Sequence, residues 1–137
     1  MKVRDVMQRK VVTLGERDSA FEALRTLVRR GVSGAPVVRD GRVVGLVTEF
    51  DLLLALDFIG DGVEVAKVMK TEVVGVRPDT SLVEVRSLFM THRFRRVPVV
   101  SRGRLVGIVS RRDLLRAELE SSRHAPARSG TRRGRSR

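Results

Sequence analysis

The stretch PVVRDGRVVGLVTEFDLL, residues 36–53, recurs 62 positions later as PVVSRGRLVGIVSRRDLL, residues 98–115. Shorter matches keep the same spacing without a gap, so that Val6 aligns with Val68. A repeat with one fixed period identifies a duplicated supersecondary unit. A unit of roughly 60 residues buries little core on its own, so we expect the two copies to share one fold.

Helix signals open each copy. Ser19 followed by Glu22 is a capping-box pattern, in which the hydroxyl and the carboxylate bond to the free N–H groups at a helix start. Apolar residues then follow at helical spacing, and Gly31 is typical of a helix end. Residues 11–14, before this helix, form a short β-type run. The second copy repeats the capping pattern from Ser81.

Hairpin signals follow in both copies. Residues 35–38 and 42–47 are β-rich runs around an Asp-Gly pair at 40–41, which is typical of a tight hairpin turn. The second copy has Arg-Gly at 102–103. Residues 48–56 predict a second helix. The fold class expected is therefore α/β (α+β), with the order β-α-β-β-α occurring twice.

The repeat and the charge together divide the chain into three parts: a first repeat at 1–60, a second at 61–120 and a basic tail at 121–137. The formal net charge is +12, and the tail alone carries six Arg and no acidic residue. Because the tail has no apolar periodicity, we expect it to be disordered. Such a tail either stays solvated without a partner or binds nucleic acid electrostatically.

Composition excludes several classes of function. The chain has no Cys, which excludes disulfides and thiolate catalysis, and its two His are far apart in sequence, which argues against a metal site. No apolar run approaches about 18 residues, so we expect a cytoplasmic protein without a membrane segment. Glycine-rich nucleotide loops and nucleophile–base patterns are missing from the sequence, so we expect neither an enzyme nor a required cofactor.

Taken together, the motifs resemble a tandem pair of CBS (cystathionine-β-synthase) domains, a Bateman module, over about residues 3–120. The resemblance rests on the Asp-Val-Met opening at 5–7, the Pro-Val-Val runs, the glycines around the second strand of each hairpin and the Ser/Thr-x-x-Asp endings. It implies two repeats around a pseudo-two-fold axis, with their sheets packed together, helices outside and two clefts between them. It also implies a flat homodimer and an adenosine ligand: AMP, ADP, ATP or S-adenosylmethionine.

The Ser/Thr-x-x-Asp endings have two interpretations. Thr48 and Ser110 are placed to cap a helix, and Asp51 and Asp113 are favoured in a first helical turn by the helix dipole. The family resemblance implies instead that these hydroxyls and carboxylates bind phosphate and ribose. Both interpretations fit the spacing.

Basic residues precede the second Pro-Val-Val run. In CBS modules of the AMP-activated protein kinase type, basic residues two and three positions before this Pro contact phosphate, and Arg95 and Arg96 occupy those positions. Arg112 adds positive charge nearby. The first copy has Ser33 and Gly34 instead, so we expect unequal clefts; the alternative is a solvated basic loop. Sequence does not decide which Asp shares a cleft with these arginines.

The adenine would need an apolar wall with backbone hydrogen bonds. The residues proposed for that wall are Thr13, Ser33, Gly34, Ala35, Pro36, Gly75, Val97 and Pro98. The function that follows is a regulatory module that senses an adenine nucleotide and transmits a conformational change to an effector protein. The alternatives are a dimerisation or interaction scaffold with empty clefts, and a nucleic-acid binder that uses the basic tail.

Overall fold

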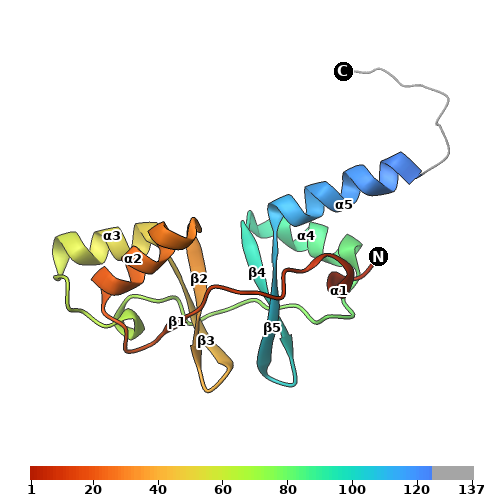
Figure 1. Ribbon diagram of the computed structural model, residues 1–137. Helices are drawn as coiled ribbons and strands as arrows, with labels where there is room; N and C mark the ends of the chain where they lie inside the picture. The colour runs from red at the N-terminus through yellow and green to blue at the C-terminus, as the bar shows by residue number, and fades with distance from the viewer. Residues whose placement is uncertain (125–137) are drawn as a thin grey trace, which may run out of the picture.

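The computed structural model describes residues 1–124 and has the expected duplicated architecture (Figure 1). The first half contains α1 (Val3–Val6), β1 (Leu14–Gly15), α2 (Ala20–Arg30), β2 (Gly34–Arg39), β3 (Arg42–Thr48) and α3 (Glu49–Phe58). The second half contains the 3-10 turn η1 (Val65–Lys67), α4 (Leu82–His92), β4 (Arg96–Ser101), β5 (Arg104–Ser110) and α5 (Arg111–His124). The short strand that precedes α4 is reduced to a single parallel bridge between Val76 and Val99.

The predicted caps and turns explain where the elements begin and end. Ser19 Oγ accepts a hydrogen bond from the Glu22 N–H at 3.2 Å, and the equivalent bond in α4 has the same length. The turn between β2 and β3 places Asp40 and Gly41 at φ 53° and 80°, the left-handed backbone that a two-residue hairpin requires. The predicted β-run at 11–14 is shorter than expected, because pairing with β2 begins only at Leu14.

The strands form one sheet in the order β1-β2-β3-β5-β4. The two repeats meet where β3 and β5 run antiparallel, and the register there pairs Arg42 with Arg104. Figure 1 shows α2 and α3 beside the strands of the first repeat and α4 and α5 beside those of the second. The hairpin turns point away from the helices. The seam between the repeats therefore has a helix-side end and a hairpin end.

Each repeat lends its opening segment to the core of the other. Val3 in α1 is fully buried in the second-repeat core with Val85 and Val97. Val65 in η1, its equivalent 62 residues later, is fully buried in the first-repeat core with Leu27. Figure 1 shows that the segments after α1 (residues 7–13) and after η1 (residues 68–81) cross the seam, and we call them the crossing segments. The two repeats are therefore intertwined, although each hydrophobic core has its own helix pair.

The crossing segments pack closely on two glycines. A Cβ at Gly45 would lie 2.5 Å from Met69 Sδ and 2.9 Å from the Lys70 carbonyl oxygen. A Cβ at Gly107 would lie 2.8 Å from Met7 Sδ and 2.9 Å from the carbonyl oxygen of the next residue. These contacts leave no room for a side chain at either position, which explains the glycine inside the second strand of each hairpin.

The C-terminal helix extends further than the sequence predicted. Helix α5 continues to His124, so residues 121–124 are helical where the sequence predicted the start of a disordered tail. The rest of that predicted basic tail, and its nucleic-acid interpretation, lie outside the described residues.

Within residues 1–124, no helix is both long and apolar enough to cross a bilayer, and no three His, Asp or Glu side chains are grouped to hold a metal ion.

Candidate ligand-binding clefts

Two clefts open along the seam between the repeats, with volumes of about 400 and 350 Å³. Both volumes fall within the range of small-molecule sites, about 300–1,000 Å³. The first, the α5 cleft, is lined by Gln8, Lys10, Val11, Val12, Gly31, Val32, Ser33, Gly34, Arg96, Ile108, Ser110 and Asp113. The second, the α3 cleft, is lined by Ala35, Leu46, Val47, Thr48, Asp51, Lys70, Glu72, Val74, His92, Arg93, Phe94, Arg95, Arg96 and Val97.

The two clefts are built from equivalent positions. Asp113 and Ser110 at the start of α5 correspond, 62 residues earlier, to Asp51 and Thr48 at the start of α3. Each cleft combines this helix start with the opening segment of a repeat and with the strand start of β2 or β4. The intertwined opening segments therefore do more than fill the cores, because they supply one wall of each cleft.

Asp51 caps helix α3 and still has a free oxygen. The Asp51 N–H donates to Thr48 Oγ1 at 3.1 Å, and the Thr48 N–H donates to Asp51 Oδ2 at 3.0 Å, which is a complete capping box. The Glu49 N–H donates to the Ser33 carbonyl oxygen at 2.9 Å. Among residues 1–124, the second carboxylate oxygen of Asp51 has no hydrogen-bond partner. This oxygen is available to accept a hydrogen bond from a ligand hydroxyl.

Asp113 holds the equivalent position, but its carboxylate accepts more hydrogen bonds than that of Asp51. Its Oδ2 accepts from the Ser110 N–H at 2.8 Å and from Ser110 Oγ at 2.9 Å. Its Oδ1 accepts from Gln8 Nε2 at 3.0 Å and lies 3.5 Å from Arg116 Nη1. With 3% of its surface exposed, Asp113 is buried and its carboxylate is satisfied by the protein itself. A ligand hydroxyl would have to replace Gln8 at Oδ1.

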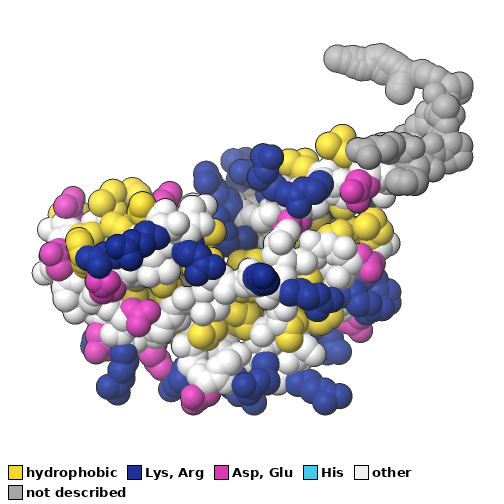
Figure 2. Space-filling view, viewed as in Figure 1, with side chains coloured by type: hydrophobic (Ala, Val, Ile, Leu, Met, Phe, Trp, Pro, Cys, Tyr) yellow, Lys and Arg dark blue, Asp and Glu magenta, His cyan; other side chains and the backbone are white. Residues whose placement is uncertain are grey.

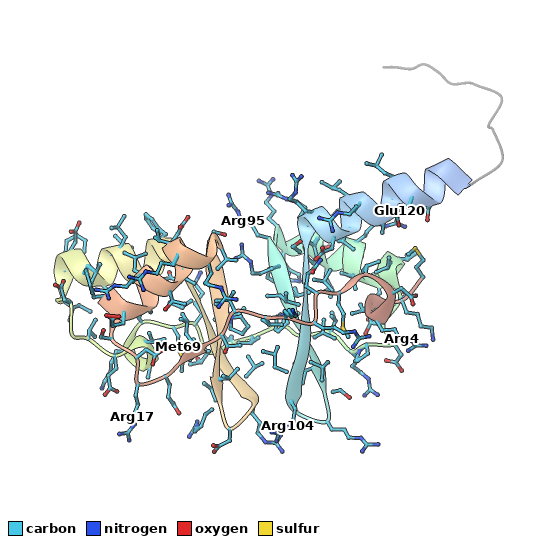
Figure 3. All side chains as sticks on the ribbon, in the orientation of Figure 1. Arg4, Arg17, Met69, Arg95, Arg104 and Glu120 are labelled. Carbon is cyan, nitrogen blue, oxygen red and sulfur yellow. The ribbon has the colours of Figure 1, made fainter. Side chains whose placement is uncertain are left out.

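The predicted basic pair lies at the helix-side end of the seam. Arg95 lines the α3 cleft with Asp51, whereas Arg96 lines both clefts and donates through Nη2 to Ser33 Oγ. Figure 2 shows Lys and Arg side chains gathered between the two helix pairs, and Figure 3 shows Arg95 at that end, opposite Arg104 at the hairpins. Burial, then repulsion from Arg95, lowers the pKa of Arg96, while Glu49 acts in the opposite direction. The guanidinium stays charged at neutral pH.

Five predicted residues do not line either cleft. Pro36 in β2 and Pro98 in β4 are fully buried and are not among the lining residues of either cleft. Thr13 and Gly75 are exposed residues within the two crossing segments. Arg112 is exposed on α5, because it follows the helix start by one position and so projects from another face than Asp113. Their assignment to a wall or a phosphate site stays a prediction.

Sequence reasoning missed the polar residues of the opening segments. Gln8 and Lys10 line the α5 cleft, and their equivalents Lys70 and Glu72 line the α3 cleft. These residues lie outside helices and strands, so no periodicity draws attention to them. The 62-residue spacing pairs them, and this was the one available signal.

The chain matches known proteins over most of its described length. The family model of the CBS domain matches twice, at residues 3–57 and 65–120. An uncharacterised protein, MJ1225, of Methanocaldococcus jannaschii is 36% identical over 116 residues, 83% of this chain. The chain spans 41% of the length of that relative.

Two solved structures have the same architecture and contain ligands. CBSX2 in complex with AMP is 31% identical, with a TM-score of 0.79, and the match covers 88% of this chain and 98% of that one. The CBS domain pair of MJ0100, in complex with 5′-methylthioadenosine and S-adenosyl-L-methionine, is 25% identical, with a TM-score of 0.78 and the same coverage. With two matched repeats and this shared fold, the chain belongs to the CBS domain family and is a tandem CBS pair.

Proposed function

We propose that this CBS pair is a regulatory module that binds adenine nucleotides in the α3 and α5 clefts, with AMP as the preferred ligand. Binding changes the relation between the two repeats, and an effector protein reads that change. The observation that carries the proposal is the meeting of a free Asp51 carboxylate oxygen, Arg95 and Arg96 around one cleft of about 350 Å³.

The α3 cleft is the better nucleotide site. The free oxygen of Asp51 is placed to accept a ribose hydroxyl, as acidic residues do in other nucleotide sites. Arg95 and Arg96 supply planar guanidinium groups that bind phosphate oxygens in pairs. Ala35, Val74 and the neighbouring apolar lining give the base a wall. The capping role of Thr48 and Asp51 coexists with this site, because capping occupies only one carboxylate oxygen.

The α5 cleft is a weaker site of the same kind. Asp113 and Ser110 repeat the ribose acceptor, and Val11, Val12 and Ile108 form an apolar wall. Its cations are Lys10 and Arg96, and its carboxylate is already bonded to Gln8. A nucleotide in this cleft must compete with the internal hydrogen bond, so we expect lower affinity than in the α3 cleft.

The solved relatives support the ligand class. CBSX2 was solved with AMP and the MJ0100 pair with S-adenosyl-L-methionine and 5′-methylthioadenosine, so adenosine is common to the bound molecules. The two guanidinium groups of the α3 cleft favour a ligand with phosphate over one without. ADP, ATP and S-adenosylmethionine share the adenosine part and belong in the same assay.

We also propose that the partner includes a second copy of the chain. Apolar side chains stay exposed on all four long helices, and three of them recur at the 62-residue spacing, as the pairs Phe21 and Val83, Val28 and Met90, and Leu53 and Leu115. The others are Phe50, Leu54 and Phe58 on α3 and Leu119 on α5. Two similar apolar faces on one chain suit a two-fold dimer, in which each face is covered by its counterpart.

The test of ligand binding uses the unusual composition. With no Trp and no Tyr, the protein absorbs very little at 280 nm, so strong absorbance near 260 nm reports a co-purified nucleotide or nucleic acid. Chromatography of the material released by heating distinguishes the two. Ligand-free protein is then titrated calorimetrically with AMP, ADP, ATP and S-adenosylmethionine. AMP at about 100 times Kd should stabilise the fold by about 2.7 kcal/mol.

The matched pair Asp51→Asn and Asp57→Asn locates the site. Both residues lie on α3, but Asp51 lines the cleft and Asp57 is exposed on the helix. We expect Asp51→Asn to weaken AMP binding about tenfold or more and Asp57→Asn to leave it unchanged. Absence of binding for all four ligands would reject the sensor in favour of a scaffold with empty clefts.

A further inference from the structure

One pair of equivalent positions beside the clefts differs in both size and charge. Strand β2 begins at Gly34 and strand β4 begins at Arg96, 62 residues later. The Arg96 guanidinium extends across the seam onto its own counterpart, because a Cβ at Gly34 would lie 2.8 Å from Arg96 Nη1. Arg96 Nη2 donates to the hydroxyl of Ser33, which is the counterpart of Arg95. One repeat thus provides the cation and the other provides the space and the acceptor.

This position makes Arg96 common to both clefts. Of the residues described, Arg96 is the one that lines the α3 cleft and the α5 cleft together. The α3 cleft has other cations in Arg93, Arg95 and Lys70. In the α5 cleft, Lys10 is the other one. Engagement of Arg96 in the α3 cleft would therefore remove half of the cationic side chains available to the α5 cleft.

A guanidinium binds one phosphate best. Its donors lie in one plane, and the strongest arrangement uses two parallel N–H groups on two oxygens of the same phosphate. A second phosphate, in the other cleft, would meet the less favourable remaining donors and the charge of the first phosphate. An uncharged adenosine places no such demand on Arg96.

From this geometry we propose that Arg96 couples the two clefts, so that a phosphate-bearing ligand in the α3 cleft lowers the affinity of the α5 cleft for a second phosphate-bearing ligand. The inference rests on the proposed nucleotide binding and goes beyond it. When a nucleotide occupies the α3 cleft, the α5 cleft then favours an adenosine ligand without phosphate over a second nucleotide. Because coupling free energy is reciprocal, a nucleotide in the α5 cleft weakens the α3 cleft by the same factor.

The experiment compares the α5 cleft with its neighbour empty and filled. The double variant Asp51→Asn/Arg95→Ala changes the α3 cleft at two residues and leaves the lining of the α5 cleft intact. Calorimetry on this variant gives the AMP affinity of the α5 cleft alone. The second binding step of the unmodified protein gives its affinity beside an occupied α3 cleft. We expect AMP to bind about 5- to 150-fold more weakly in the second case, and adenosine to bind equally in both.

Arg96→Ala should remove this difference, while Arg95→Ala, which changes one cleft only, should retain it. Arg96→Gln serves as a second variant, because Gln is uncharged but fills more of the space of the arginine than Ala does. Circular dichroism checks that each variant is folded. If the unmodified protein binds one AMP, a second AMP in Arg96→Ala also supports the coupling.

Two AMP molecules that bind independently in the unmodified protein would overturn the coupling and leave the proposed function standing. A difference of the same size in Arg96→Ala, or one seen equally with adenosine, would overturn it as well. Absence of AMP binding at both clefts would reject the proposed function itself, and this outcome is distinguishable from the others.

Discussion

The α3 cleft and the α5 cleft share one construction but differ in charge. Both place a hydroxyl and a carboxylate at a helix start, yet Asp51 keeps a free oxygen and Asp113 is bonded to Gln8. At equivalent positions, Lys10 in one cleft becomes Glu72 in the other. The duplication has kept what the fold requires, the helix caps and the close-packed glycines. The residues that face an open cleft differ, because their packing constraints are weaker.

The largest expected effect is on the stability of the proposed dimer, and it comes from the exposed apolar residues of the helices. Leu53 on α3 and Leu115 on α5 are equivalent and 52% and 57% exposed. In a two-fold dimer each substitution occurs twice, and burying a Leu contributes about 1.5–3 kcal/mol. We expect Leu53→Glu or Leu115→Glu to weaken a dimer by at least about 3 kcal/mol, roughly 100-fold.

Sedimentation equilibrium across a range of protein concentrations measures this effect. Equal weakening by the two variants would mean that both helix pairs are covered in the dimer. A response to only one of them would limit the interface to that repeat, and an unmodified chain that stays monomeric at high concentration would remove the homodimer from the proposal.

The two aspartates provide the second effect, on stability. Asp113→Ala removes the buried carboxylate that accepts from Gln8 Nε2 and from the Ser110 N–H, and the loss of these charge-assisted hydrogen bonds and of the helix cap costs about 3 kcal/mol of unfolding free energy. Asp51→Ala removes a helix cap on the surface of a cleft and costs about 1 kcal/mol. Urea unfolding of both variants gives the comparison. Similar losses would show that Asp113 is less engaged than its hydrogen bonds indicate.

The close-packed glycines provide the smallest expected difference between the repeats. Alanine at Gly45 or Gly107 would meet a methionine sulfur and a backbone oxygen on a crossing segment, so each substitution costs about 1–2 kcal/mol. We expect the two midpoints of thermal unfolding to fall by similar amounts. A neutral Gly107→Ala beside a costly Gly45→Ala would mean that the first crossing segment packs more loosely than the second.

Much of the fold could be predicted from local sequence. The capping serines and the Asp-Gly and Arg-Gly pairs fix where helices start and hairpins turn, and these predictions are confirmed at Ser19, Ser81 and Gly41. The exchange of opening segments was not predicted. Burial of Val3 and Val65 in the opposite core depends on contacts between residues distant in sequence, and no local pattern specifies them.

The candidate site was predicted in part. Asp51 and Asp113 each line one cleft at the seam, and Arg96 lines both, because these residues lie at the ends of fixed elements of each repeat. The proposed base wall contains residues that line a cleft, such as Val97, and residues that do not, such as Pro36, because the strand pattern alone does not show which positions face the seam. The question of which Asp accompanies Arg95 required the packing of the two repeats, and the answer is Asp51.

The central claim is that the α3 cleft recognises phosphate on an adenosine ligand, and one calorimetric comparison tests it most directly. AMP and adenosine are titrated into the unmodified protein, into Arg95→Ala and into the control Arg112→Ala, whose arginine is exposed outside both clefts. We predict that Arg95→Ala weakens AMP about tenfold or more, that it changes adenosine binding little, and that Arg112→Ala changes neither. Equal losses of AMP and adenosine affinity in Arg95→Ala would contradict the account.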